Sequence, residues 1–273
     1  MMRFWFSTQR LLTALCCFLS IFLANSCISS EGFGTRPRDD FESLWRTIDR
    51  HYCFFDFKHK EYGLDWNEVH ERYRKQISDS MSPQALFQVL GKMCNELRDG
   101  HVNLWSPQNT ARYTRWYEAY PVNFSDSLLR RALGSSDEYR LASGMQYKIF
   151  DDNVGYLRCA SFDMALGAGN LHEIMRYLST CDGLIVDVRN NGGGYLTSAE
   201  TLAAVFTNEE KVVGYISHKT GPGHSDFSTP KPIVLQPGKG LRWQKPVVVL
   251  ANRRTYSAAN AFVMYMKALP NVT

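Results

Sequence analysis

The second half of the chain alternates short apolar, β-branched runs with segments of helical periodicity, and this alternation constrains the fold more than any other feature of the sequence. Residues 184–188 form one such run and residues 247–250 form another. Each run leads through a glycine-rich or polar turn into an apolar helical segment. This order of elements is typical of α/β proteins with buried strands. We therefore expect an α/β fold.

Local patterns predict most of the individual elements of this half. A hairpin is expected around residues 151–153, because two apolar runs flank the Asp-Asp-Asn turn. The other expectations are helices over about 170–180, 195–206 and 258–269, strands over 211–217 and 247–250, an irregular Gly- and Pro-rich loop over 221–240, and the beginning of a further strand at 271–273.

Residues 39–100 are expected to form a helical module. Apolar residues recur at helical spacing behind Asp39, and again from Trp66 onwards. Ser82 followed by Pro83 is typical of a helix N-terminus, and the segment after it has one apolar face. Past the module, residues 102–105 are expected to form a short strand.

The composition excludes some classes of protein. With 44% hydrophobic residues, the chain can bury a core without disulfides or metal ions. Lys and Arg exceed Asp and Glu only by 31 to 27, and no basic run stands out. A nucleic-acid-binding protein that depends on phosphate contacts is therefore not expected.

The N-terminus has the pattern of a secretory signal. Arg3 and Arg10 precede an apolar run over residues 11–24, which is short for a permanent membrane span and suits a signal peptide. We expect residues 1–26 to be removed and the protein to be exported.

Cys27 follows the expected cleavage site, and it allows two interpretations. It fits a bacterial lipobox loosely, in which case residues 27–38 are a flexible tether and the protein is attached to the cell envelope through lipid. Alternatively, an ordinary signal peptidase cuts the same bond and leaves a soluble periplasmic protein. The lipoprotein is our expectation.

The remaining thiols show no metal-binding pattern. No C-x-x-C pair occurs among the four cysteines after Cys27, which are Cys53, Cys94, Cys159 and Cys181. They could pair as disulfides in an oxidising compartment, or they could be isolated buried thiols. Histidines and an aspartate between residues 51 and 59 also match no ligand motif, and a half-buried structural segment is expected there. No metal or cofactor is expected.

Three consecutive glycines follow the strand at 184–188. Gly192, Gly193 and Gly194 free the backbone to present N–H groups at a helix start, where they could hold a phosphate or the oxyanion of an acyl-transfer intermediate. A tight structural turn explains the same residues. The segment is not a nucleotide-binding fingerprint.

Ser257 lies between the strand at 247–250 and the helix that begins at Ala258. A hydroxyl at this place can act as a nucleophile, because the helix N-terminus favours developing negative charge. Serine is also among the best N-cap residues, and taken alone the cap is the expected role of Ser257.

His101 follows the break at Gly100. It is either a surface residue or the base that accepts the proton of a serine hydroxyl. A run of aromatic residues comes next, which could line a cleft for apolar peptide side chains, although core packing is the expected role: Trp105, Tyr113, Trp116, Tyr117 and Tyr120.

Together these segments resemble a known family. Residues 187–193 (Asp-x-Arg-x-Asn-Gly-Gly), residues 255–259 (Thr-Tyr-Ser-Ala-Ala) and residues 97–101 (Leu-Arg-Asp-Gly-His) look like the motifs of the tail-specific and tricorn-core serine peptidases. The resemblance covers about residues 39–273, and the three motifs follow the family order.

The resemblance implies a helical N-terminal module packed on a crotonase-like α/β core over residues 101–273. It implies hydrolysis of peptide bonds in peptide or protein substrates without a cofactor. The site residues that it implies are Ser257 as nucleophile, His101 as base, and an oxyanion hole made by the backbone of Gly192 or Gly193 and by the N–H of Ala258.

The sequence departs from each branch of the family. The tail-specific branch uses a Lys beyond the Ser and carries a PDZ module, and neither is expected here. The tricorn-core branch uses a His from the upstream module, as His101 would be, but has Ser where this chain has Gly100 and often Glu where it has Asn260. Its supporting carboxylate lies further along the chain than residue 273, so a core truncated at its C-terminus is expected. The alternative is a catalytically inactive ligand-binding module, as in the retinoid-binding relatives of this fold.

Overall fold

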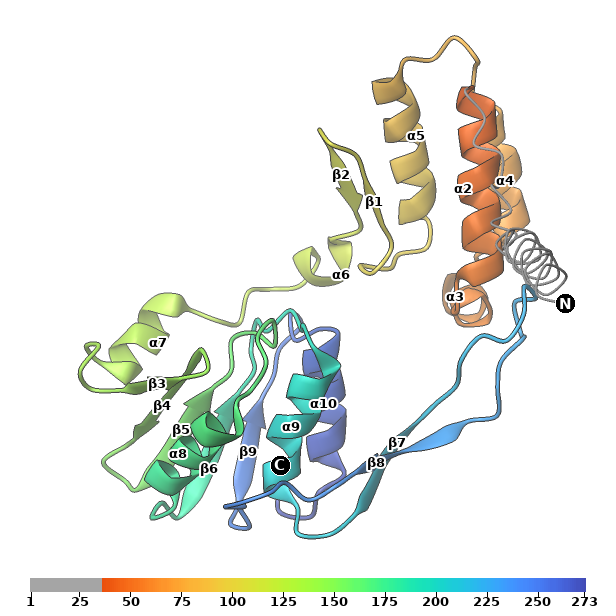
Figure 1. Cartoon of the computed structure of the whole chain (residues 1–273). Helices are drawn as coiled ribbons and strands as arrows, with labels where there is room; N and C mark the ends of the chain where they lie inside the picture. The colour runs from red at the N-terminus through yellow and green to blue at the C-terminus, as the bar shows by residue number, and fades with distance from the viewer. Residues whose placement is uncertain (1–35) are drawn as a thin grey trace, which may run out of the picture. The chain divides into compact units, whose positions relative to one another are not determined.

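The computed structural model describes residues 36–273. The predicted signal peptide, Cys27 and all but the last three residues of the predicted tether lie outside the described residues. The described residues fall into two compact units, residues 36–93 and residues 94–273 (Figure 1). None of the helices formed by residues 36–273 combines the length and the apolar character needed to cross a membrane.

Helices make up the described part of the first unit: α2 (Pro37–His51), α3 (Phe55–Tyr62), α4 (Trp66–Arg74) and α5 (Pro83–Asn95), the last of which runs into the second unit. The helices expected from periodicity are thereby confirmed. α3 was not predicted as a helix, although its segment was expected to be structural and half-buried. Phe55 of α3 is buried, whereas the nearby Cys53 is exposed.

Capping and aromatic packing explain why these helices form where they do. The Ser82 hydroxyl accepts a hydrogen bond from the Ala85 N–H at 3.2 Å, and Asp65 caps α4 in the same way. Trp45 of α2 and Trp66 of α4 stack, and each indole N–H donates to the backbone carbonyl of the other residue. These bonds satisfy both indoles inside the apolar interface between α2 and α4.

The second unit is built on a five-stranded sheet with the order β3-β4-β5-β6-β9. The strands are β3 (Arg140–Ala142), β4 (Met145–Ile149), β5 (Val154–Arg158), β6 (Gly183–Asp187) and β9 (Val247–Leu250). The β3–β4 and β4–β5 pairs are antiparallel, and β5, β6 and β9 are parallel to one another. The expected hairpin and the expected α/β fold are confirmed.

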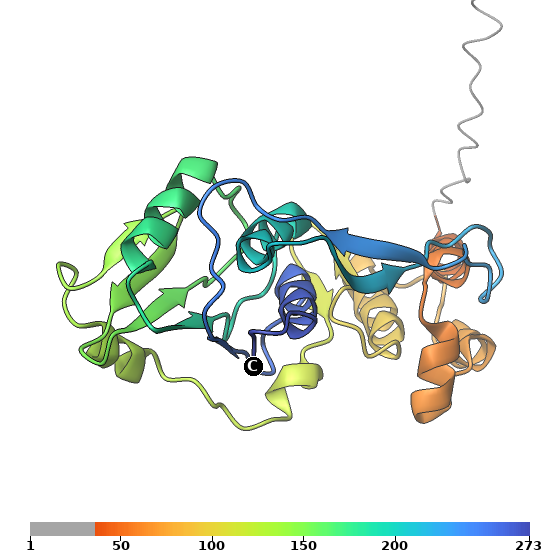
Figure 2. The same cartoon turned by 90° about the horizontal axis from the view of Figure 1, so that it is seen from below.

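Crossover segments connect the parallel strands. α8 (Ala168–Leu178) joins β5 to β6, and α10 (Ala258–Lys267) follows β9. Between β6 and β9 the chain forms α9 (Leu196–Ala203), a short 3-10 turn and the antiparallel ribbon of β7 (Lys211–Ile216) and β8 (Lys231–Leu235). Figures 1 and 2 both show this ribbon extending away from the sheet.

The core of the second unit lies where these helices pack on the sheet. Its fully buried apolar side chains come from the parallel strands, the three helices and the loop after β5, and include Leu157, Phe162, Ile174, Val186, Leu202 and Phe262. Cys94, Cys159 and Cys181 are buried and free. In the described structure these three thiols are therefore small buried hydrophobes rather than disulfide partners.

Two further expectations for this unit had different outcomes. The segment 221–240 is not an irregular loop throughout, because β8 lies within it and pairs with β7. Ile233 and Val234 are β-branched, and the glycines and prolines around them obscured this signal. The expected beginning of a strand at 271–273 is present as a parallel bridge between Val272 and Val247, with backbone hydrogen bonds that join Asn271 and Thr273 to β9.

Small elements precede the sheet in the second unit: β1 (Asn103–Trp105), β2 (Thr110–Arg112), α6 (Arg115–Glu118) and α7 (Asp126–Leu133). β1 confirms the predicted short strand, and β1 and β2 form a hairpin. The expectation that the aromatic run around them packs in the core was wrong. None of its five members is buried, and Trp105 is 72% exposed. The hairpin and α6 are too small to cover these rings.

Candidate active site

The loops that follow β6 and β9 meet at one edge of the sheet. Because the two strands are parallel and Asp187 pairs with Leu250, both chains leave the sheet side by side. The Val188 N–H donates to the Leu250 carbonyl at 2.9 Å, and the Thr255 hydroxyl donates to the Val188 carbonyl at 2.9 Å. The glycine turn and the Ser257 turn are thereby brought together.

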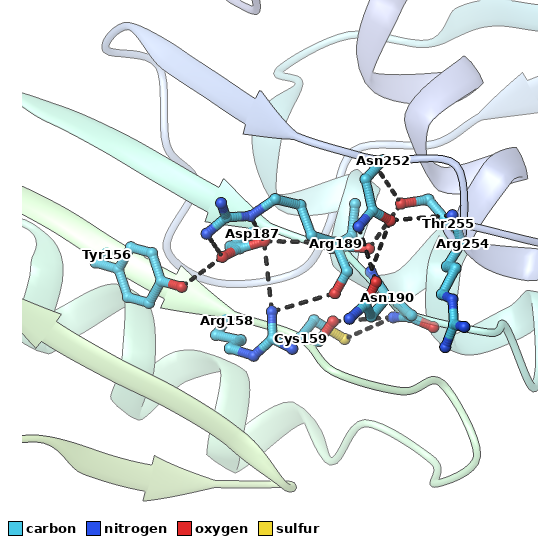
Figure 3. Close-up of polar contacts among 11 residues, drawn as sticks. Tyr156, Arg158, Cys159, Asp187, Arg189, Asn190, Asn252, Arg254 and Thr255 are labelled. Carbon is cyan, nitrogen blue, oxygen red and sulfur yellow. Dashed lines mark hydrogen bonds and ion pairs between the residues drawn. The ribbon is translucent and has the colours of Figure 1, made fainter. Parts of the chain in front are cut away.

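An asparagine pair locks the two loops (Figure 3). The Asn190 N–H donates to Oδ1 of Asn252 at 2.9 Å, and Nδ2 of Asn252 donates to Oδ1 of Asn190 at 2.8 Å. Oδ1 of Asn252 also accepts the Arg254 N–H at 3.1 Å. Since each hydrogen bond restrains a different part of the loops, their relative position is well defined.

Asn191 is fully buried beneath the glycine turn. Its Nδ2 donates to the Cys159 carbonyl at 3.0 Å, its Oδ1 accepts the Gly193 N–H at 2.9 Å, and its carbonyl accepts the Tyr256 N–H at 3.0 Å. Through its side chain Asn191 connects the segment after β5 to the glycine turn, and through its backbone carbonyl it holds the residue before Ser257.

Gly193 is the point of closest approach between the two loops. Its φ is +100°, and a Cβ at this position would lie 2.7 Å from Cβ of Ser257 and 2.8 Å from the Tyr256 carbonyl oxygen. Only glycine fits there without displacing the serine. Its N–H is bonded internally to Asn191, whereas the N–H of the exposed Gly192 has no hydrogen-bond acceptor within residues 36–273.

Ser257 occupies a strained backbone conformation at the start of α10. Its φ is +55° and its ψ is −126°, and its side chain makes no capping hydrogen bond. The interpretation as a capping side chain was therefore wrong. A non-glycine residue in such a region costs about 1 to 3 kcal/mol, and such residues cluster at functional sites.

The serine is exposed in a cleft of the second unit. Trp116 and Tyr117 of α6 contribute to its wall, and so do two arginines, Arg112 and Arg254. Nε of Arg112 donates to Oδ1 of Asn103 at 2.6 Å, and the Arg254 guanidinium lies 4.3 Å from the centre of the Tyr117 ring. No carboxylate is among the residues that line the cleft, which are Gly100, His101, Asn103, Arg112, Trp116, Tyr117, Asn190, Gly192, Arg254, Tyr256 and Ser257. The cleft is therefore basic and partly aromatic.

His101 borders the same cleft, and its side chain is 58% exposed. Its Nδ1 forms a hydrogen bond with the Tyr256 hydroxyl, and Oδ1 of Asp99 lies 3.5 Å from the same nitrogen. In the described chain no hydrogen bond joins His101 to Ser257. The structure thus places the predicted nucleophile and the predicted base in one cleft, without direct contact.

Asp187 lies behind this cleft at the end of β6 and is fully buried. It accepts hydrogen bonds from Tyr156 at 2.6 Å and from the Arg189 guanidinium at 2.6 and 3.0 Å, and Arg158 lies 3.4 Å away (Figure 3). Burial acts to raise the pKa of Asp187, but the hydrogen bonds from Arg189 and Tyr156 outweigh it and hold the pKa below its usual value. Asp187 is a charged structural group that anchors the end of the strand.

Several residues around the site had no predicted role. Asp99, Asn191 and Tyr256 lie inside the three motifs, and Arg112 and Arg254 carried no signal of their own. Within residues 36–273, no group of three His, Cys, Asp or Glu side chains is arranged to hold a metal ion.

Comparisons with known proteins fit this geometry. The pattern of the Tricorn protease C1 domain matches residues 34–95, and the pattern of peptidase family S41 matches residues 153–273. The crystal structure of a candidate peptidase from Parabacteroides merdae ATCC 43184 superposes on this chain with a TM-score of 0.82. The two sequences are 44% identical, and the match covers 88% of this chain and 75% of the Parabacteroides chain. The chain belongs to peptidase family S41.

Other S41-related proteins share less with it. The carboxy-terminal processing protease CtpA of Bacillus subtilis (strain 168) is 28% identical over 124 residues, which are 45% of this chain and 24% of that protease. The chain therefore spans about a quarter of the length of this relative. A crystal structure of a CPAF variant has a TM-score of 0.63 at 11% identity, with 87% of this chain and 82% of that chain covered, and so shares the fold.

Proposed function

We propose that this S41 family member is an exported serine peptidase, with Ser257 as its nucleophile and His101 as its base. The observation that carries the proposal is the conformation of Ser257. Its hydroxyl is exposed in a cleft, makes no capping bond and lies on a strained turn at a helix N-terminus. A serine that serves only the helix would adopt an ordinary capping geometry.

In the proposed reaction, the Ser257 oxygen attacks the carbonyl carbon of a peptide bond while its proton passes to Nε2 of His101. The tetrahedral intermediate collapses when that proton is given to the leaving amine, and water then hydrolyses the acyl-enzyme by the reverse use of the same groups. Catalytic hydrogen bonds are often long in substrate-free sites and form when substrate binds. The lack of a bond between His101 and Ser257 is compatible with this role.

The oxyanion is proposed to bind the N–H groups of Gly192 and Ala258. Both backbone donors lie beside Ser257 and have no hydrogen-bond acceptor within residues 36–273. The N–H of Gly193, the other glycine considered, is committed to Asn191 at 2.9 Å. Gly193 is therefore assigned a packing role, in which it lets the serine turn approach the glycine turn.

The wider architecture is proposed to be that of a crotonase-like core with a helical N-terminal module. The order of β4, β5, β6 and β9, with helices crossing between the parallel strands, supports the first part. The match of residues 34–95 to a tricorn domain supports the second part. Peptide or protein chains are the proposed substrates.

Two measurements test the nucleophile. Ser257→Ala is expected to abolish peptide hydrolysis and covalent labelling by a fluorophosphonate, while the free energy of unfolding changes by less than about 1 kcal/mol because no cap bond is lost. Ser217→Ala, at an exposed serine of the segment after β7, is the matched control and should keep both properties. Unchanged turnover in Ser257→Ala would reject the assignment, and a wild-type protein that is neither labelled nor active would indicate a binding module on the same fold.

The pH profile tests the base. An imidazole ordinarily protonates near pH 6.5, and a protonated His101 cannot accept the serine proton. Activity is therefore expected to fall as the pH is lowered and the imidazole becomes protonated. A profile that rises only above about pH 8 would indicate an amine base instead.

The location is proposed to be the bacterial cell envelope, with a lipid on Cys27 as the anchor. The proposal depends on the apolar run at residues 11–24 and on the cysteine that follows it. Cys27→Ser is expected to move the full-length protein from the membrane fraction to the soluble fraction of the envelope. A wild-type protein that is already soluble after export would favour ordinary signal-peptidase cleavage.

A further inference from the structure

Two side chains, Tyr256 and Asp99, lie next to Nδ1 of the His101 ring. The Tyr256 hydroxyl is hydrogen-bonded to Nδ1, and the Asp99 carboxylate lies 3.5 Å from the same nitrogen. The Asp99 carboxylate also accepts the backbone N–H of His101 at 2.9 Å. The Asp99 side chain is only 12% exposed, whereas that of His101 is 58% exposed.

The ring of Tyr256 stacks against two aromatic neighbours, His101 and Trp116. Its centroid lies 4.3 Å from that of His101 and 4.3 Å from that of Trp116, with an interplanar angle of 24° in each case. Gly100 leaves room for this stack, because a Cβ there would lie 2.6 Å from Nε1 of Trp116 and 3.0 Å from the Tyr256 hydroxyl oxygen. The absence of a side chain at residue 100 therefore allows the phenol to reach the histidine.

The direction of the hydrogen bonds follows from the chemistry of the three groups. Burial, and then the charge and hydrogen bond of Asp99, raise the pKa of Tyr256 to about 12, although the nearby Arg112 acts in the opposite direction. The phenol therefore keeps its proton at neutral pH. The Asp99 carboxylate, 3.5 Å from Nδ1 of His101, can only accept, so a proton on Nδ1 faces an acceptor and the phenol oxygen is assigned to accept from Nδ1–H. This arrangement leaves the lone pair on Nε2.

We infer that Tyr256 and Asp99 are positioning residues that hold His101 in the tautomer with its proton on Nδ1 and its basic nitrogen, Nε2, free for Ser257. The inference rests on the proposed function, in which His101 is the base. In a serine triad the wrong tautomer of the histidine removes most of the activity, because the basic nitrogen then faces away from the serine. The phenol bonded to Nδ1, together with the nearby Asp99 carboxylate, would do the work that a directly bonded carboxylate does elsewhere.

The tautomer itself can be measured without any substrate. In the full-length protein with ¹⁵N-labelled histidine, long-range ¹H–¹⁵N correlation spectra above pH 7 distinguish a protonated Nδ1 from a protonated Nε2, and His101→Gln assigns the signals. The wild type is expected to carry the proton on Nδ1, and Tyr256→Phe to shift His101 towards the other tautomer. A wild-type His101 protonated on Nε2, or the same tautomer in both proteins, would overturn the inference.

Kinetics provide the second readout. Tyr256→Phe keeps the stacked ring and is expected to lower kcat by about 10- to 100-fold, the usual effect of removing an orienting partner, with KM changed less than about twofold. Asp99→Asn should move the acidic limb of the pH profile to lower pH, because the imidazolium loses a neighbouring negative charge. Tyr215→Phe, at an exposed tyrosine of β7 outside the cleft, is the control and should behave as wild type. Wild-type kcat and pH limb in both test variants would overturn the inference, whereas full activity of Ser257→Ala would overturn the proposed function itself.

Discussion

Replacing Gly193 by alanine is expected to damage both the stability of the second unit and the candidate site. The added methyl group would lie 2.7 Å from Cβ of Ser257, 2.8 Å from the Tyr256 carbonyl oxygen and 3.0 Å from the Ala258 nitrogen. Two of these neighbours are backbone atoms and the third is attached directly to the backbone. Rotation of a flexible side chain cannot relieve the overlap.

The magnitude has two parts. A φ of +100° is unfavourable for alanine, and strained backbone of this kind costs about 1 to 3 kcal/mol. Overpacking against atoms that cannot move freely adds about 1 to 3 kcal/mol. The free energy of unfolding should therefore fall by about 2 to 6 kcal/mol, which corresponds to a decrease in Tm of roughly 4 to 24 °C for a unit of this size.

Gly192→Ala is the matched control for this substitution. No atom lies within 4 Å of the position of its Cβ, so its free energy of unfolding should change by no more than about 1 kcal/mol. Urea unfolding and calorimetry of the two variants provide the comparison, and fluorophosphonate labelling reports whether Ser257 has moved. If Gly193→Ala is as stable as Gly192→Ala and is labelled at the wild-type rate, the packing argument is refuted.

Two further predictions concern charge. Asp187→Asn should lower the free energy of unfolding at pH 7 by about 3 to 5 kcal/mol, because Arg158 and Arg189 lose their buried partner. Folding lowers the pKa of Asp187, so the stabilisation by its carboxylate is fully present above the ordinary carboxyl pKa and is lost as the pH falls through the pKa of the folded state. Urea unfolding should therefore show that the stability difference between Asp187→Asn and the wild type becomes smaller below about pH 4. In the cleft, Arg112→Gln and Arg254→Gln should raise KM several-fold for peptides that carry a carboxylate, and should weaken the increase of that KM with salt. Equal KM changes for neutral and acidic peptides would contradict this reading of the basic cleft.

Much of the secondary structure could be predicted from local patterns. The helices α2, α4 and α5 follow from apolar residues at helical spacing and from the caps Asp65 and Ser82. β6 and β9 follow from their β-branched runs. These signals are local because they depend only on how side chains repeat along a helix or strand. β8 was missed because glycines and prolines surround a run of only five residues.

The sequence by itself also determined which segments carry the candidate chemistry, since the three motifs contain Ser257, His101 and the glycine turn. Only the tertiary structure decided how these groups are used. The parallel pairing of β6 and β9 brings the glycine turn against the serine turn, so that only glycine fits at residue 193, and within the glycine turn the Gly193 N–H donates to Asn191. The bond between Tyr256 and His101 joins residues 155 positions apart. Such contacts depend on how distant strands and loops pack, and no periodicity along the chain records them.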